Sequence, residues 1–98
     1  MAERSPTGRL LKLSAADNVA VATADLAAGE TVAWENATIE IAEVIPLGHK
    51  VAVTSIGIGE KIVKYGCPIG SATRDIAPGR HVHTHNVKRD YMPTFAPR

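Results

Sequence analysis

The chain has 98 residues, 45% of them hydrophobic, and its eleven basic and ten acidic side chains give a formal net charge of +1. This length indicates one small domain, and the near-neutral charge and scattered aromatic residues argue against nucleic acid or a membrane as a partner. The single cysteine, Cys67, excludes an internal disulfide bond, and no apolar run approaches the roughly 20 residues of a membrane span. The polar N-terminus does not resemble a signal peptide, so we expect a cytoplasmic protein.

Polar and turn-forming residues divide the chain into three parts. Residues 1–9 are polar, contain proline and glycine, and are predicted to be a flexible N-terminus. Residues 10–87 carry the apolar pattern of a folded domain. Residues 88–98 contain two prolines and are predicted to form a C-terminal tail, either disordered or docked on a partner through Tyr91 and Phe95.

Short strands are predicted along the whole domain. Asp17 and Asn18 are typical of a turn, because their side chains bond nearby backbone amides. Alternation of apolar and polar or small side chains predicts strands at residues 10–13, 19–24, 38–42, 50–54 and 61–65. Single helical turns fit only residues 14–17 and 24–28, because no stretch keeps the 3.6-residue period over ten residues. The predicted fold class is therefore all-β, small and irregular, with at most one or two helical turns.

One glycine motif occurs four times. In each copy an aliphatic residue lies three positions before a glycine and another lies three positions after it, with the glycines at Gly29, Gly48, Gly59 and Gly79. The motif predicts a tight turn in which the glycine takes a positive φ, followed at once by a strand. The four copies suggest a loose internal duplication. Residues 66–70, with two glycines and a proline, are predicted instead to be a sharp loop, with Cys67 buried or half-buried.

Three of the four histidines alternate at His81, His83 and His85, with Val82 and Thr84 between them. If this run is a strand, the three imidazoles share one exposed face. They are candidate catalytic acids or bases. His83 and His85, or His81 and His83, could also converge on a metal, although no nearby carboxylate completes such a site. The alternative is a strand face with solvated imidazoles.

The remaining candidates lie on loops bordered by glycine. His49 and Lys50 follow Gly48, Lys64 and Tyr65 precede Gly66, and Asn86 ends the histidine run. These side chains can bind an anion or transfer a proton, and they are the candidate substrate-binding residues. Surface decoration or turn chemistry explains each of them taken singly, as it does Asp17 and Asn18. Their combination on so small a domain fits half of a site that another chain completes.

Several of these stretches, in this order, resemble a known family. They are residues 17–21, 45–50, 63–66, 68–70 and 79–86, and the resemblance runs from about residue 11 to residue 87. The chain resembles the N-terminal SAF domain of the altronate and galactarate dehydratases. The resemblance implies a β-clip fold, a compact and irregular all-β domain.

The resemblance also implies a function. Members of this family eliminate water from sugar acids and use a divalent metal, iron or manganese, held mostly by a larger catalytic domain or subunit. It implies that this chain is the SAF subunit or domain of such a lyase and has no activity alone. His81, His83 and His85 would then line a cleft shared with the large subunit.

Three alternatives remain open at this point. The small subunit of sulfolactate sulfo-lyase, which eliminates sulfite, is similar. The domain could instead be a non-catalytic module for carbohydrate binding or assembly, because SAF domains also occur outside these lyases. A homo-oligomer is also compatible with the sequence.

Overall fold

A computed structural model describes residues 9–89 of the chain. These residues form nine short β-strands and contain no α-helix, which confirms the predicted all-β fold class. The strands are β1 (Leu10–Leu11), β2 (Val19–Ala22), β3 (Thr31–Trp34), β4 (Ala37–Glu40), β5 (Lys50–Ala52), β6 (Lys61–Lys64), β7 (Cys67–Ala72), β8 (His81–Val82) and β9 (Val87–Lys88). Residues 9–89 contain no helix that could cross a membrane. The predictions for residues 1–8 and 90–98 lie outside the described residues.

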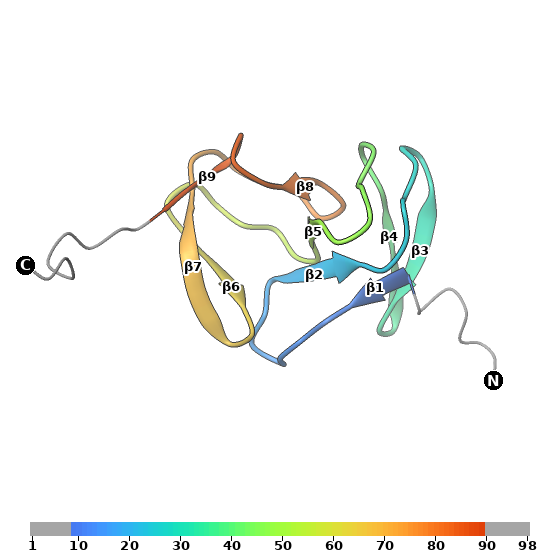
Figure 1. The fold of residues 1–98 in the computed structure, drawn as a ribbon, viewed down its shortest axis with the longest axis horizontal. Helices are drawn as coiled ribbons and strands as arrows, with labels where there is room; N and C mark the ends of the chain where they lie inside the picture. The colour runs from blue at the N-terminus through green and yellow to red at the C-terminus, as the bar shows by residue number, and fades with distance from the viewer. Residues whose placement is uncertain (1–8, 90–98) are drawn as a thin grey trace, which may run out of the picture.

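The strands form three small antiparallel sheets. The largest has the order β1-β2-β5-β8, so that β2 and β5 are its central strands. The β3–β4 hairpin is a sheet of its own, and β6, β7 and β9 form the third. Figure 1 shows the two hairpins at opposite ends of the molecule, with the four-stranded sheet between them.

Two hydrophobic cores lie on either side of the four-stranded sheet. Because successive residues of a strand point to opposite faces, Val51 of β5 packs with β3 and β4, whereas Ala52 packs with β6 and β7. Val32 and Ile62 are the equivalent anchors from the two hairpins, and both are buried. Each such side chain stabilises the fold by about 1.5–3 kcal/mol. The sheet is thus held from both sides, and its edge strand β8 is fixed in place.

The four predicted turn glycines all have positive φ, between 86° and 91°. The aliphatic residue before each of them is buried, and these residues pair across the molecule as Leu26 with Ile45 and Ile56 with Ile76. The two pairs give each half of the chain the same arrangement of turn, hairpin and turn, which is the structural form of the duplication. At Gly79 a Cβ atom would also overlap the carbonyl oxygen of Glu40, so the backbone of this turn lies directly against the end of β4.

The predicted loop at residues 66–70 is wrong, because β7 runs through Pro68 and Gly70. The register shifts between Ile62 and Val63, and this irregularity accommodates the proline, which has no N–H to donate. Gly70 is required for packing, because a Cβ there would lie 2.6 Å from the carbonyl oxygen of Lys88 in β9. Cys67 is exposed rather than buried. Of the predicted loop only Gly66 lies in a turn, which it forms with Tyr65 from the end of the predicted strand 61–65, and both residues have positive φ.

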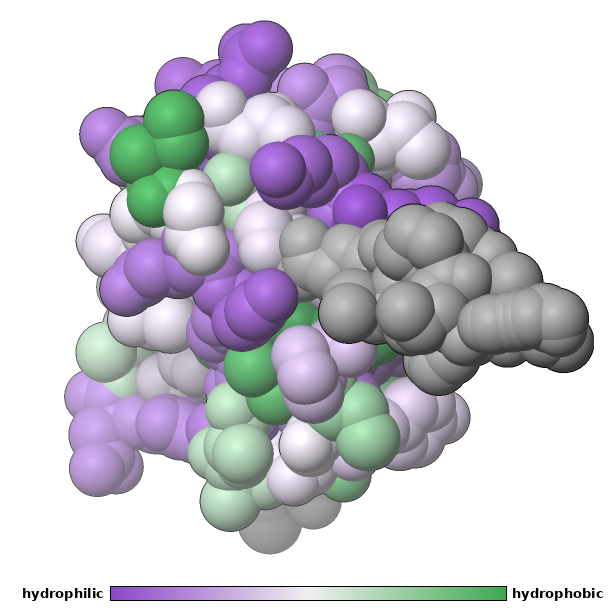
Figure 2. Space-filling model, turned by 90° about the vertical axis from the view of Figure 1, so that its left-hand side faces the viewer, coloured by the Kyte–Doolittle hydropathy of each residue, from purple (hydrophilic) through white to green (hydrophobic). Residues whose placement is uncertain are grey.

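Large apolar side chains are also exposed on the surface. Those more than 40% exposed are Leu11, Val44, Leu47, Ile58, Tyr65 and Ile69. On the end of the molecule drawn in Figure 2, hydrophobic residues are interspersed with hydrophilic ones. Single exposed apolar residues are ordinary for a protein surface.

Candidate functional site

The histidine run is a strand only at its start. β8 ends at Val82, and residues 83–86 form a turn, so the predicted strand through His85 is wrong. The cause is the buried side chain of Asn86. Its Oδ1 accepts the backbone N–H of His83 at 3.0 Å, and its Nδ2 donates to the carbonyl of His81 at 2.8 Å. Asparagine side chains commonly compete with the sheet ladder in this way.

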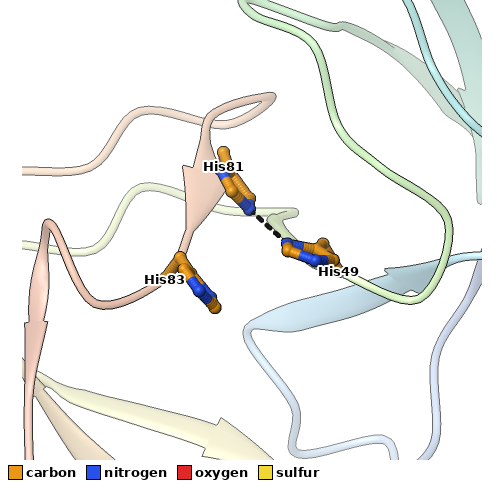
Figure 3. Close-up of side chains that lie close together, drawn as sticks. All are labelled: His49, His81 and His83. Atoms are coloured by element: carbon orange, nitrogen blue, oxygen red, sulfur yellow. Dashed lines mark hydrogen bonds between the residues drawn. The ribbon is translucent and has the colours of Figure 1, made fainter.

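The turn nevertheless brings the rings together, and His49 joins them. The centroids of the His81 and His83 rings lie 5.3 Å apart, and the rings are stacked with 7° between their planes. The His49 ring lies 4.9 Å from each of these two. The His85 ring lies 5.5 Å from that of His81. We call these four residues the histidine cluster; Figure 3 shows the rings of His49, His81 and His83 directed into one space.

Sheet pairing explains why His49 reaches this space. It follows the turn at Gly48 and immediately precedes β5, whose residues Lys50 and Val51 pair with Val82 and His81 of β8. The residue before β5 therefore lies beside the end of β8. As a result, Nδ1 of His49 and Nε2 of His81 are 2.8 Å apart, in hydrogen-bonding contact.

His81, like His49, is only partly exposed, whereas His83 and His85 are exposed. Partial burial, together with the neighbouring rings of His49, His83 and His85, lowers the pKa of His81, and Glu43 opposes the shift. Glu43 Oε2 accepts the backbone N–H of His81 at 3.0 Å. The neutral imidazole is thus favoured, and a neutral imidazole can accept a proton or bind a metal.

A cleft of about 680 Å³ lies beside the cluster, and His85 contributes to its wall. Arg74, Arg80, Glu43 and Asp75 also line the cleft. Both carboxylates already have partners: Glu43 lies 3.8 Å from Arg80, and Asp75 accepts the backbone N–H of Ile58 at 2.9 Å. Within residues 9–89, Arg74 has no hydrogen-bond or ion-pair partner. The sequence pattern did not single out either arginine: Arg80 directly precedes His81, whereas nothing local links Arg74 to the histidines.

Lys50, Lys64 and Tyr65 do not join the cluster. Lys50 follows His49 in an extended segment and so points to the opposite face of the sheet, towards the β6–β7 hairpin. Partial burial, followed by the charge of Lys64, lowers the pKa of Lys50. Tyr65 is exposed at the hairpin turn, and Nζ of Lys64 lies 5.5 Å from its ring centroid. The candidate substrate-binding residues are therefore divided between two faces of the sheet.

Asp17 and Asn18 hold this hairpin turn in place. The buried Asp17 carboxylate accepts the backbone N–H groups of Ser14, Tyr65 and Gly66 at 2.7–3.0 Å. Burial raises the pKa of Asp17, but these hydrogen bonds outweigh it and hold the pKa below its ordinary value. Asn18 bonds the backbone of β6 at both ends of its amide, through Lys61 and Val63. These hydrogen bonds explain the presence of Asp17 and Asn18 without a role in ligand binding.

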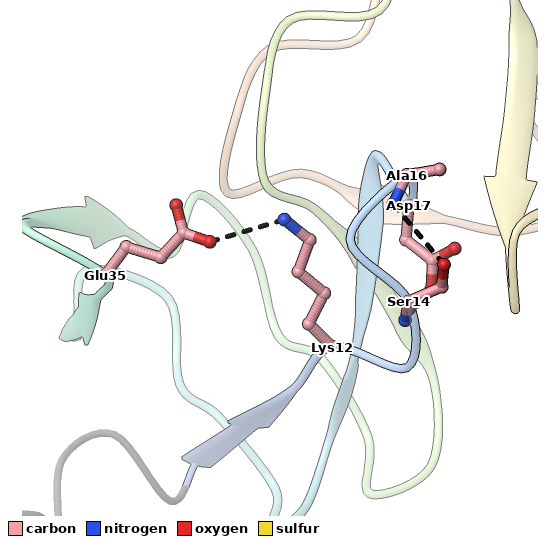
Figure 4. A network of polar contacts seen from close by, with 5 residues as sticks. All are labelled: Lys12, Ser14, Ala16, Asp17 and Glu35. Atoms are coloured by element: carbon pink, nitrogen blue, oxygen red, sulfur yellow. Dashed lines mark hydrogen bonds and ion pairs between the residues drawn. The ribbon is translucent and has the colours of Figure 1, made fainter.

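The surroundings of this loop are shown in Figure 4. The backbone N–H of Ala16 donates to Oγ of Ser14 at 3.4 Å, and Nζ of Lys12 pairs with Oε2 of Glu35 at 3.3 Å. Exposed contacts of this kind contribute little stability. Asp17 is the central residue of the loop.

Comparison with known proteins identifies the family. Residues 8–90 match the altronate/galactarate dehydratase SAF domain. The chain belongs to this SAF domain family. It is 50% identical over 93 residues to altronate dehydratase of Escherichia coli (strain K12), and 44% identical over 93 residues to altronate dehydratase of Bacillus subtilis (strain 168). It is also 43% identical over 49 residues to the (2R)-sulfolactate sulfo-lyase subunit alpha of Chromohalobacter salexigens.

The alignments cover very different shares of these proteins. Each altronate dehydratase alignment includes 87% of this chain but 19% of the relative, so the SAF domain spans about a fifth of those enzymes. The alignment with the sulfo-lyase subunit includes 50% of this chain and 52% of that subunit. The resemblance inferred from the sequence is confirmed at the level of the family.

The family resemblance implies iron or manganese, held mostly by the larger domain or subunit, and of these two metals the nitrogen ligands of the histidine cluster suit iron. The candidate ligand atoms of His49, His81 and His83 all lie within 4.8 Å of one another. Imidazole nitrogens suit iron, zinc and cobalt, whereas manganese prefers carboxylate and water oxygens. Of the two predicted metal pairs, His81 with His83 lies within this set, whereas His83 with His85 does not.

Proposed function

We propose that this SAF domain is part of a carbon–oxygen lyase that dehydrates a sugar acid of the altronate or galactarate type. The observation that carries the proposal is the histidine cluster beside a cleft with two arginines, in a chain that belongs to the dehydratase SAF family. A domain of this size encloses no substrate by itself. Catalysis is therefore shared with a large subunit, and the SAF domain alone is inactive.

The reaction breaks two bonds and forms one double bond. A base removes the proton from the carbon next to the carboxylate, the electron pair forms a carbon–carbon double bond, and the β-hydroxyl leaves. The hydroxyl takes up a proton and departs as water. Imidazoles serve both proton transfers near neutral pH. A divalent metal supplies positive charge that stabilises the enolate developing on the carboxylate side.

The residues around the cleft have different roles in this reaction. Arg74 and Arg80 bind the carboxylate of the acid, because guanidinium groups pair with carboxylates in a two-point geometry. His85 lines the cleft and carries the proton to or from the substrate. The His81 ring lies 5.5 Å from the His85 ring. Asn86 acts by fixing the turn that presents His83 and His85, rather than by touching the substrate.

The sulfolactate sulfo-lyase relatives support a second candidate. This chain is 48% identical over 44 residues to the subunit alpha of Paracoccus pantotrophus, and that alignment includes 66% of the subunit. Elimination of sulfite uses the same proton removal next to a carboxylate, with a different leaving group. The name of these relatives also supports a two-subunit organisation for this chain. The sugar-acid assignment is favoured because the altronate dehydratase alignments cover 87% of the chain.

Reconstitution tests both candidates. The chain is mixed with the product of the adjacent reading frame, and loss of altronate and of galactarate and release of sulfite from sulfolactate are measured. Dehydration that requires both chains is expected. His85→Ala should lower kcat by about 100-fold or more, as for loss of a general acid or base. Thr84→Ala, in the same exposed turn, is the matched control and should retain activity.

Two outcomes would count against the proposal. If the partner is fully active without this chain, the SAF domain is a non-catalytic binding or assembly module. If sulfolactate alone is consumed, the chain belongs to the sulfite-eliminating branch.

A further inference from the structure

We infer that this chain itself carries a divalent transition-metal site, with His49, His81 and His83 as its three ligands. The inference rests on the proposed function and deepens it, because it gives the SAF domain a metal site of its own. The site contains one of the two pairs that the sequence suggests, His81 with His83, and adds His49, which lies 32 positions before His81 in the chain.

The distances fit a metal with a small adjustment. Nitrogen ligands lie about 2.1 Å from such a metal, so two of them on one ion are about 3.0–3.4 Å apart. His49 Nδ1 and His81 Nε2 are 2.8 Å apart, and the ligand atoms of all three residues fall within 4.8 Å. His83 is exposed, and rotation of its side chain closes the remaining gap.

The hydrogen bonding of the rings also favours a ligand. Within residues 9–89, the contact between His49 and His81 is the one hydrogen bond that these three rings make. It requires a proton on one of the two nitrogens, and a metal ion bound by both would replace that proton.

The backbone holds two of the ligands firmly. His81 and the residue after His49 belong to paired strands, and the backbone N–H of His81 is fixed by Glu43. The turn closed by Asn86 sets the position of His83. Preorganised ligands of this kind favour binding, because little ordering is required when the ion enters. Three nitrogens leave coordination positions open for a carboxylate or hydroxyl group, as in catalytic metal sites.

His85 provides the internal control. Its ring lies near that of His81, but it is not one of the three ligands and faces the cleft. A site made of His49, His81 and His83 must depend on His49, far away in sequence, and not on His85, close by. A metal site made only of residues of the histidine run would instead depend on His85 and not on His49.

The test is a metal titration of the tag-free chain. Co²⁺ is followed by its visible absorption and Zn²⁺ by calorimetry, and folding of each variant is checked by circular dichroism. We expect one equivalent of metal to bind with a dissociation constant at or below micromolar. His49→Ala and His83→Ala should each weaken binding more than about tenfold, since even the loss of outer-shell partners costs 10–100-fold. His85→Ala should change it less than threefold.

Three results would overturn the inference: no binding near micromolar metal, binding that persists in His49→Ala, or binding that is lost in His85→Ala. His83 is exposed, so His83→Ala remains informative even if His49→Ala fails to fold. The readout is separate from the dehydratase assay. Metal binding without dehydration would refute the proposed function alone, and dehydration without metal binding by this chain would refute this inference alone.

Discussion

Two polar clusters of this domain differ in how many of their hydrogen-bonding atoms have partners. Around Asp17, both carboxylate oxygens accept backbone N–H groups, and Asn18 bonds β6 with both ends of its amide. In the histidine cluster, His49 and His81 share one hydrogen bond within residues 9–89, and the ring of His83 makes none there. The first cluster is therefore complete without a ligand, whereas the second has bonding capacity left over. Side-chain atoms that could still bind a ligand, held on a fixed backbone, distinguish a candidate site from a cluster that only stabilises the fold.

The largest effect on stability is expected from Asp17→Ala. The substitution leaves the backbone N–H groups of Ser14, Tyr65 and Gly66 without their acceptor and removes the support for the positive φ of Tyr65. The midpoint temperature of unfolding should fall by about 10 °C in a domain of this size. Circular dichroism during heating measures it.

The comparison supplies the control for this prediction. His83→Ala removes an exposed side chain with no hydrogen bond from its ring, and should change the midpoint by less than about 2 °C. Equal losses in the two variants would show that the histidine cluster is structural, and the distinction between the two clusters would fail.

The second prediction concerns pH. The folded-state pKa of Asp17 lies below its ordinary value of 3.8. As the pH falls, the unfolded chain therefore takes up this proton first. The stabilisation is present above about pH 4 and is lost as the pH falls through the folded-state pKa.

Urea unfolding of the natural chain and of Asp17→Asn measures this effect. The gap between their free energies of unfolding should be constant from pH 5 to 7 and shrink below pH 4. A gap that keeps its size at low pH would mean that the charge of Asp17 does not contribute.

Local sequence patterns predict the regular parts of this fold. Positive φ at the four turn glycines follows from the spacing of aliphatic residues around each glycine, and all four were predicted correctly. β7 was missed, because Pro68 and Gly70 are poor strand residues by themselves. They are tolerated there by a register shift in the pairing with β6 and by the close approach of β9, and neither feature is visible in one segment.

The histidine cluster shows the same limit. Alternation with Val82 and Thr84 predicts a strand, but the side chain of Asn86 ends it at Val82. His49 belongs with His81 only because β5 pairs with β8, and Arg74 lines the same cleft as His85 only through the fold of the chain between them. Residue types can thus indicate candidate site residues, whereas which of these residues lie together depends on pairings between distant segments.

The smallest predicted effect tests the cleft. Arg74 is exposed and has no ion-pair partner within residues 9–89, so Arg74→Ala should leave the unfolding midpoint unchanged. In the reconstituted enzyme it should raise KM for the acid about fivefold with little change in kcat, because an exposed ion pair contributes up to about 1 kcal/mol. Lys88→Ala, which removes an exposed cation outside the cleft, is the control and should leave KM unchanged. An unchanged KM in Arg74→Ala would remove Arg74 from substrate binding. The carboxylate would then have to be bound by other cations, either Arg80 in the cleft or Lys50 and Lys64 near the β6–β7 hairpin.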